Sequence, residues 1–221
     1  MEHEMVQSGL TITKPEAEAG TFYDRIAGLY DITFKLNGYG RSLDQYLSAH
    51  PLRLSPGARV LDAGCGTGLL TLALLRAVEV PLQITAVDLS ASSLAKAERA
   101  VAGHLKRSHQ VWFTQANVLA LPFADDSFDL VVTSGALEYV SLREGFSELA
   151  RVLMPGGYML HLPVRPSLPS RFLELLFRFK THPPREVAEN TERHFRIIED
   201  YRFPPLEPIG WTKTAVLAQK L

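Results

Sequence analysis

The stretch Val60–Leu70 reads VLDAGCGTGLL. An apolar run ends at Asp62, glycines follow at alternate positions, and a second apolar run begins at Leu69. Glycine adopts backbone conformations that other residues avoid, so it marks a forced turn or a close approach to the backbone. A strand, a glycine-rich turn and a helix N-terminus together form a cradle for nucleotides, because the helix start offers unpaired N–H donors. The stretch therefore predicts a nucleotide-type site at the end of a strand in an α/β domain.

The spacing of the glycines excludes the two common phosphate-binding loops. The dinucleotide fingerprint requires Gly or Ala where Leu69 stands, which disfavours a nicotinamide-dependent dehydrogenase. The P-loop requires Lys followed by Ser or Thr after its last glycine, and here the pair Leu69-Leu70 occupies that place. The pattern therefore favours a nucleoside ligand with a charged tail and no phosphate.

Two later strand ends carry matching polar residues. Asp88 ends the segment AVDLS, about twenty residues after the glycines, where a carboxylate can accept hydrogen bonds from ribose hydroxyls. Asn117 follows the next predicted strand, where a polar side chain can meet the edge of an adenine ring. The ends of three predicted strands thus offer a glycine-rich loop, a carboxylate that can bind ribose and a polar side chain that can bind the edge of adenine.

Strand-like and helix-like stretches alternate through most of the chain. Strands are predicted at 59–63, 83–89, 111–116, 128–134 and 158–162, and helices at 66–78, 91–103 and 142–154. Ser90 is the expected N-cap of the second of these helices, and Pro155-Gly156-Gly157 is expected to stop the third. Alternation of this kind predicts a mostly parallel sheet with helices on both faces. Two closing strands, near 195–203 and 212–219, have no helix between them and are predicted to be antiparallel.

Composition restricts the class of protein. The chain has 221 residues, of which 46% are hydrophobic and 21% charged, and this length and composition predict one globular domain. The net charge of −1 predicts no electrostatic attraction to nucleic acid. Its single cysteine, Cys65, excludes an intramolecular disulfide and a thiolate metal cluster and fits a cytoplasmic protein. No signal-peptide core and no run of roughly 18 apolar residues are apparent. Residues 1–20 are expected to be a flexible leader, and 21–221 a single domain.

Four blocks of sequence carry a resemblance. VLDAGCGTG, AVDLS, LPFADDSFDLVV and ELARVLMPGG, in this order across roughly residues 58–163, resemble a class I S-adenosylmethionine-dependent methyltransferase. The segment FYDRIAGLYD ahead of them resembles the N-terminal helix of quinone-biosynthesis methyltransferases and of bacterial phospholipid N-methyltransferases. The resemblance implies a Rossmann-like fold: a seven-stranded, mostly parallel sheet with an antiparallel last strand. It also implies S-adenosylmethionine as cofactor and no metal.

The resemblance also implies roles for matching positions. The expected cofactor-binding residues are Asp62, Gly64, Cys65, Gly66 and Gly68 at the methionine end, Asp88 at the ribose, Leu89, Asn117 and Val118 at the adenine, and Ser134 and Tyr23 beside the sulfonium. Cys65 is expected to be a buried loop residue with no catalytic role. Tyr23 lies in a helical segment, 21–50, that either packs on the core or closes as a lid over the cofactor.

Methyl transfer from a sulfonium needs alignment more than activation, so a general base is required only if the acceptor must lose a proton. Three residues near strand ends are candidates, and the sequence does not choose among them: Tyr139, His161 and Glu138. Tyr139 is expected to line the pocket, and a histidine inside a strand is more often structural.

The acceptor is predicted to be a small, apolar molecule such as a quinone precursor. A phospholipid N-methyltransferase at a membrane surface is the second reading, and a non-catalytic protein that binds the cofactor is the third. The apolar, basic helix near 170–180 could pack on the core, or it could close over an apolar acceptor as part of a lid insertion at 165–195, or it could lie on a membrane. The sequence carries no indication of oligomeric state.

Overall fold

The computed structural model of the chain describes residues 38–105 and 108–221. Tyr23, the expected leader and the first part of the helical segment lie outside these residues. The described strands are β1 (Ala58–Ala63), β2 (Leu82–Asp88), β3 (Gln110–Gln115), β4 (Phe128–Ser134), β5 (Leu153–Leu162), β6 (Phe195–Arg202) and β7 (Thr214–Lys220). The described helices are α2 (Tyr39–Ala49), α3 (Leu69–Ala77), α4 (Ala91–Ala102), α5 (Leu142–Val152), α6 (Leu168–Phe177) and α7 (Pro184–Thr191), with short 3₁₀ turns η1 (Leu137–Tyr139) and η2 (Pro208–Trp211).

The described strands form one seven-stranded sheet in the order β3-β2-β1-β4-β5-β7-β6. Strands β1 to β5 pair in parallel with one another, and β7 runs antiparallel to both β5 and β6. This arrangement confirms the predicted Rossmann-like sheet and its antiparallel closing pair. Strand order reverses between β1 and β4, and in open α/β sheets ligands bind beyond the carboxyl ends of the strands at such a point.

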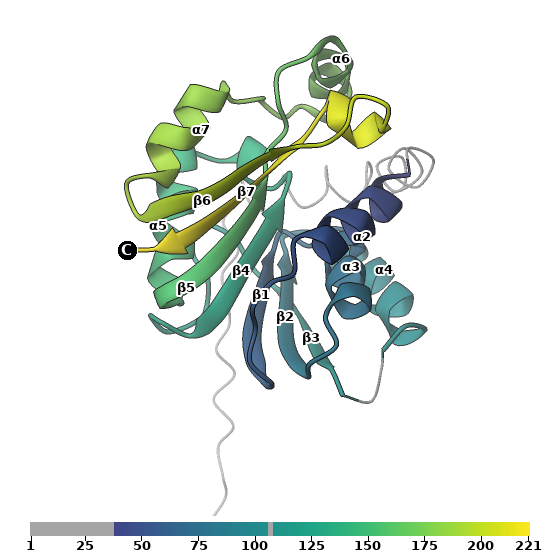
Figure 1. The fold of residues 1–221 in the computed structure, drawn as a ribbon, viewed down its shortest axis with the longest axis vertical. Helices are drawn as coiled ribbons and strands as arrows, with labels where there is room; N and C mark the ends of the chain where they lie inside the picture. Colours follow the sequence, from purple (N-terminus) through teal and green to yellow (C-terminus); the bar gives the residue numbers. More distant parts are fainter. Residues whose placement is uncertain (1–37, 106–107) are drawn as a thin grey trace, which may run out of the picture.

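Helices cover both faces of the sheet, with α2, α3 and α4 on one side and α5 and α7 on the other (Figure 1). Successive residues of β1 point to opposite faces, so Val60 belongs to the core beneath α2 and α3 and Leu61 to the core beneath α5. Both side chains are fully buried, as are Leu130 and Val131 in the neighbouring strand β4. Burial on both faces explains why these strands read as continuous apolar runs.

Several boundaries differ from the predicted ones. The helix expected to begin at Gly66 begins at Leu69, because Gly66 and Gly68 have positive φ angles and belong to the preceding turn. The helix expected to reach Met154 ends at Val152, and β5 begins at Leu153 and contains Pro155, Gly156 and Gly157 as an irregular start. Helix α7 was not predicted, because its sequence PREVAENT is polar and only Val187 and Thr191 are buried. None of the described helices combines the length and the apolar character needed to cross a bilayer.

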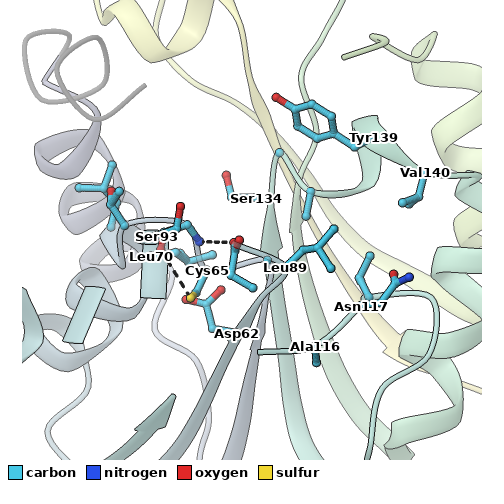
Figure 2. Close-up of a pocket in the computed structure, with 18 of the residues that line it drawn as sticks. Asp62, Cys65, Leu70, Leu89, Ser93, Ala116, Asn117, Ser134, Tyr139 and Val140 are labelled. Carbon is cyan, nitrogen blue, oxygen red and sulfur yellow. Dashed lines mark hydrogen bonds between the residues drawn. The ribbon is translucent and has the colours of Figure 1, made fainter. Parts of the chain in front are cut away.

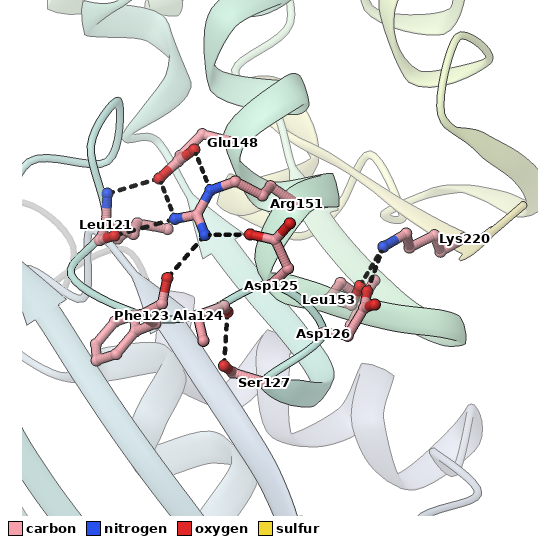
Figure 3. Close-up of polar contacts among 10 residues, drawn as sticks. All are labelled: Leu121, Phe123, Ala124, Asp125, Asp126, Ser127, Glu148, Arg151, Leu153 and Lys220. Atoms are coloured by element: carbon pink, nitrogen blue, oxygen red, sulfur yellow. Dashed lines mark hydrogen bonds and ion pairs between the residues drawn. The ribbon is translucent and has the colours of Figure 1, made fainter.

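Arg151 of α5 fixes the loop between β3 and β4. Its guanidinium donates to Glu148 and Asp125 and to the backbone oxygens of Leu121 and Phe123, at 2.7–3.0 Å (Figure 3). The two carboxylates raise the pKa of Arg151 further above its usual value. These bonds to carbonyls and carboxylates hold the LPFADD segment against α5.

Candidate functional site

A cavity opens at the carboxyl edge of the sheet, where β1, β2 and β4 end (Figure 2). It is lined by Tyr39, Asp62, Gly64, Cys65, Gly66, Thr67, Leu69, Leu70, Asp88, Leu89, Ser93, Ala116, Asn117, Val118, Ser134, Gly135, Ala136, Tyr139, Val140 and Lys213. The cavity therefore gathers most of the residues singled out from the sequence.

The glycine loop after β1 forms one wall of this cavity. The N–H groups of Gly64 and Cys65 both donate to the carbonyl of Val87, at 2.8 Å, which fixes the loop to the end of β2. Gly64 has φ +75°, and a Cβ there would lie 2.3 Å from the Cβ of Ala136, so only glycine fits. At Gly66, φ is +54° and no atom lies within 4 Å of an added Cβ. A side chain at Gly66 would enter space that the protein itself does not fill.

Asp88 holds the loop from the other side. Its carboxylate accepts from the N–H of Gly66 at 2.8 Å and from the N–H of Ser90 at 2.9 Å. The first bond ties the loop to β2, and the second fixes the turn that leads into α4. Asp88 thus reaches the cavity wall as part of a rigid frame.

Asp62 is a buried acid beneath the loop. It is 1% exposed, and its Oδ2 accepts from the hydroxyl of Thr71 at 2.5 Å. Its Oδ1 is buried and has no hydrogen-bond partner among the described residues. Burial, and to a smaller extent the nearby charge of Asp88, raise the pKa of Asp62 to about 7, and the hydrogen bond from Thr71 opposes the shift. An acceptor of this kind, at the wall of a cavity, fits a ligand that carries an ammonium group.

The far end of the cavity is lined by Leu89, Asn117 and Val118. The side-chain oxygen of Asn117 accepts from the N–H of Leu119 at 2.9 Å and so forms a local turn. This bond engages the amide oxygen, the acceptor that Asn117 could offer to an adenine edge. Asn117 lies where the sequence predicted it, but the geometry gives it a turn-forming role as well.

Gly68 lies apart from the cavity lining. It is the N-cap of α3, with φ +86°, and an added Cβ would meet Ala97 of α4 at 3.1–3.2 Å. The geometry therefore explains this glycine by close packing of α3 against α4. Cys65 lines the cavity but packs with Ala86 and Leu94, and burial raises the pKa of its thiol well above the usual value. The thiol is accordingly no nucleophile at neutral pH.

Of the three candidate bases, only Tyr139 lines the cavity. Glu138 is buried, and its Oε1 accepts from the N–H of Val164 at 2.5 Å. His161 is 1% exposed in β5 and packs edge-on against Phe146. Burial lowers the pKa of His161 to about 3, with further contributions from Lys213 and His182, so the imidazole stays neutral at physiological pH.

Tyr39 and Lys213 are among the cavity residues that the sequence analysis did not identify. The hydroxyl of Tyr39 lies 2.5 Å from the Oγ of Ser134, and the ammonium of Lys213 donates to the same Oγ at 3.1 Å. Tyr39 begins α2, and Lys213 immediately precedes β7, so neither belongs to a recognisable motif. Burial raises the pKa of Tyr39 above its usual value, so the phenol stays protonated. These groups form a polar wall opposite the nucleoside end.

Comparisons with known proteins agree with this geometry. Residues 60–157 match a family model described as a methyltransferase domain. The demethylmenaquinone methyltransferase of Corynebacterium urealyticum is 33% identical over 205 residues, covering 90% of this chain and 84% of that protein. The ubiquinone/menaquinone biosynthesis C-methyltransferase UbiE of Hahella chejuensis is 30% identical over 200 residues, covering 88% and 80%.

Solved structures share the fold at lower identity. The geranyl diphosphate C-methyltransferase of Streptomyces coelicolor, in complex with S-adenosyl-L-homocysteine, has a TM-score of 0.66 and 18% identity and covers 80% of this chain and 75% of that one. The [4+2]-cyclase SpnF has a TM-score of 0.72 and 20% identity and covers 93% and 96%. A cyclase and a methyltransferase share this architecture, so the fold alone does not give the reaction. The family model and the relatives with at least 30% identity do: the chain belongs to the class I S-adenosylmethionine-dependent methyltransferases and is an enzyme of the type found in quinone biosynthesis.

Proposed function

We propose that the enzyme transfers the methyl group of S-adenosylmethionine to a ring carbon of a hydroxylated, quinone-type acceptor. The observation that carries this proposal is the 33% identity to a demethylmenaquinone methyltransferase over most of both chains. The cavity supports it: the wall opposite the nucleoside end combines the aromatic residues Tyr39 and Tyr139 with the polar pair Ser134 and Lys213. Such a wall suits a flat apolar ring that carries a hydroxyl group.

We propose the following placement of the cofactor. The amino group of its methionine end meets Asp62, whose buried Oδ1 has no hydrogen-bond partner among the described residues. The backbone of Gly64, Cys65 and Gly66 encloses the rest of that end, and Asp88 receives the ribose hydroxyls. The adenine lies among Leu89, Asn117 and Val118, and Ser134 lies beside the sulfonium.

When bound, the cofactor supplies an electrophilic methyl group with a neutral thioether as leaving group. The chain contributes alignment and exclusion of water, because an in-line displacement needs the acceptor carbon held against the methyl group. The first turn of α2 supports a role in closure, since Tyr39 reaches across to Ser134 at the end of β4. We propose that α2, the described part of the segment 21–50, belongs to a lid over the cofactor.

The test is a direct assay with defined acceptors. The purified enzyme is incubated with S-adenosylmethionine and either demethylmenaquinol, a short-chain naphthohydroquinone or phosphatidylethanolamine vesicles, and the products are identified by mass spectrometry. The proposal expects C-methylation of the two ring acceptors. Methylation of the phospholipid alone would replace the proposal with a phospholipid N-methyltransferase. Binding of S-adenosylhomocysteine without methylation of any acceptor would favour the non-catalytic reading.

We also propose that α6 contacts a membrane surface from the cytoplasm. Leu168, Phe172 and Leu175, at helical spacing, are 83%, 67% and 82% exposed on one face. Leu206 and Trp211, from the segment around η2, are also exposed, and both segments lie beyond the carboxyl edge of the sheet (Figure 1). An exposed apolar helix at the edge that carries the cavity suits capture of an acceptor from a bilayer.

Vesicle sedimentation tests this contact. The double variant Phe172→Glu, Leu175→Glu should lose binding to anionic vesicles and retain wild-type turnover of a short-chain acceptor. Ile198→Glu is the matched control, because Ile198 is an exposed apolar residue on β6, away from α6. Equal sedimentation of wild type and double variant would refute the contact. We propose no particular oligomeric state.

A further inference from the structure

Lys213 is a fully buried lysine at the acceptor end of the cavity. Its side chain is 1% exposed, and its backbone is held against Val164 by an isolated antiparallel bridge. The Nζ atom donates to the Oγ of Ser134 and to the carbonyl of Leu162, each at 3.1 Å. An ammonium has three N–H groups, and among the described residues these two oxygens are its hydrogen-bond acceptors. One N–H is therefore available to a ligand in the cavity that Lys213 lines.

The charges around Lys213 do not neutralise it by direct contact. Glu138 of η1 stabilises the ammonium at longer range, while its Oε1 accepts from the backbone N–H of Val164. His161 of β5 is neutral, and the protonated phenol of Tyr39 in α2 places its ring centroid 5.9 Å from Nζ. Among the described residues, none forms an ion pair with Lys213 within 4 Å. A buried cation with no contacting anion destabilises a fold, so a structural role alone does not account for it.

Burial accordingly lowers the pKa of Lys213 to about 8, against the opposing effect of Glu138. With this pKa, Lys213 populates both its neutral amine and its ammonium form near neutral pH. A group that accepts and returns a proton during catalysis requires both forms. The hydroxyl of Ser134 bridges Lys213 and Tyr39, so the amine is held at a fixed position on the cavity wall.

We propose that Lys213 is the catalytic base of the reaction: it takes the hydroxyl proton of the acceptor and then holds the resulting oxyanion. This inference rests on the proposed function, since it needs an acceptor with an acidic hydroxyl next to the reacting carbon. Ser134 and Tyr39 position the lysine. Glu138 is a longer-range charge in this scheme, and His161 takes no part in it.

The proposed step balances as follows. The O–H proton passes to the neutral amine of Lys213, giving an ammonium beside an oxyanion. An electron pair moves from the oxyanion through the ring, so that the ring carbon bonds to the methyl group as the carbon–sulfur bond breaks and its pair stays on sulfur. The ring carbon then loses its hydrogen as a proton to solvent, the oxygen recovers its negative charge, and Lys213 returns the first proton to it. One proton is released in each turnover.

The test compares Lys213→Met with wild type as a function of pH. In the wild type, kcat/KM should rise through about pH 8, as the ammonium loses its proton, and then level off. Lys213→Met should lose about 10²–10⁴-fold in kcat/KM at pH 8 and lose the rise, because the base is gone. Affinity for S-adenosylhomocysteine, measured by calorimetry, should change less than threefold. Lys213→Arg should also be inactive above pH 8, since an arginine keeps its charge and accepts no proton.

Two further measurements keep the inference falsifiable. Lys220→Met is the matched control, because Lys220 ends β7, the strand that Lys213 precedes, and donates to Leu153 and Asp126 away from the cavity. Ser134→Ala keeps Lys213 but removes the hydroxyl that positions it. This variant should lower kcat and shift the midpoint of the pH profile, and it replaces Lys213→Met as the test if Lys213→Met does not fold.

The ionisation of bound 1-naphthol, followed by absorbance, requires no turnover. Wild type should ionise it below its free pKa, and Lys213→Met should not. A wild-type pH profile in Lys213→Met, or equal naphthol ionisation in both proteins, would overturn the inference. Absence of ring methylation by the wild type would instead overturn the proposed function, and the naphthol measurement would still decide on Lys213.

Discussion

Asp62→Asn should stabilise the ligand-free enzyme while weakening the binding of its cofactor. The carboxyl is 1% exposed, lacks a partner for Oδ1 among the described residues, and has a pKa of about 7 against 3.8 in a model peptide. Between these values the folded protein holds a proton that the unfolded chain has released. Stability therefore falls as the pH rises through this window, and the loss is complete above pH 7.

The size of the effect follows from the shift. A shift of about three pH units, at about 1.4 kcal/mol per unit, amounts to about 4 kcal/mol above pH 7, an upper figure because water can enter the cavity. Asparagine is never charged and can still accept from Thr71. We expect Asp62→Asn to be more stable than wild type by about 2–4 kcal/mol at pH 8 and nearly equal to it at pH 4.

Urea unfolding at several pH values between 4 and 8 measures the gain. The same substitution should weaken S-adenosylhomocysteine by about 1.5–3 kcal/mol, or roughly 10- to 150-fold, because a hydrogen bond to a charged group is lost. Wild-type binding near pH 6.5 should release protons, since the ammonium of the ligand lowers the pKa of Asp62. Calorimetry in buffers of different ionisation heat detects this release.

Asp44→Asn is the control for charge removal at the surface. Asp44 pairs with Arg76 at 2.8 Å and is partly exposed, so its loss should change stability by less than about 1 kcal/mol at any pH. The assignment of a buried carboxylate with a raised pKa would be refuted in either of two cases. In the first, Asp62→Asn has the same free energy of unfolding as wild type at pH 8. In the second, it exceeds wild type by the same amount at pH 4 and at pH 8.

Three further predictions test the frame of the site. Gly64→Ala should destabilise the protein by at least about 2 kcal/mol in thermal unfolding, because φ is +75° and the new methyl group would lie 2.3 Å from the side chain of Ala136. Asp88→Asn should lower S-adenosylhomocysteine affinity at least about tenfold in calorimetry, because the proposed hydrogen bond to the ribose is weakened and one of the backbone N–H groups of Gly66 and Ser90 loses its carboxylate acceptor. Arg151→Met should cost about 2–3 kcal/mol in urea unfolding, below the loss for a fully buried ion pair because its side chain is 32% exposed.

The Gly64→Ala and Arg151→Met predictions each have a matched control. Gly66→Ala should keep most of the stability but lose the cofactor, since its methyl group would enter the cavity instead of the protein. Arg185→Met should leave stability unchanged, because Arg185 is 90% exposed beside Glu189. Equal destabilisation of Gly64→Ala and Gly66→Ala, or of the two arginine variants, would contradict the packing described above.

The sequence by itself determined the class of fold and the nucleoside end of the site. Alternating apolar runs and helical segments reflect local preferences and burial on both faces, which periodicity reports directly. The glycine loop, Asp62 and Asp88 lie at strand ends, and parallel topology brings strand ends to one edge without further information. Helix α7 escaped prediction because its stability comes from tertiary contacts of Val187 and Thr191, while its composition resembles a loop.

Only the tertiary structure decided the acceptor end. Tyr39, Ser134 and Lys213 are separated by 95 and 79 residues, and no local pattern links a helix start, a strand end and the beginning of the last hairpin. Their contact depends on β7 inserting antiparallel between β5 and β6, which carries Lys213 to the carboxyl edge. The proposed cofactor end is built from consecutive residues around single turns, so short sequence motifs predict it. The acceptor wall is built by packing of elements that are distant in sequence. The lowered pKa and the fixed position of Lys213 therefore result from tertiary burial and cannot be predicted from the spacing of residues.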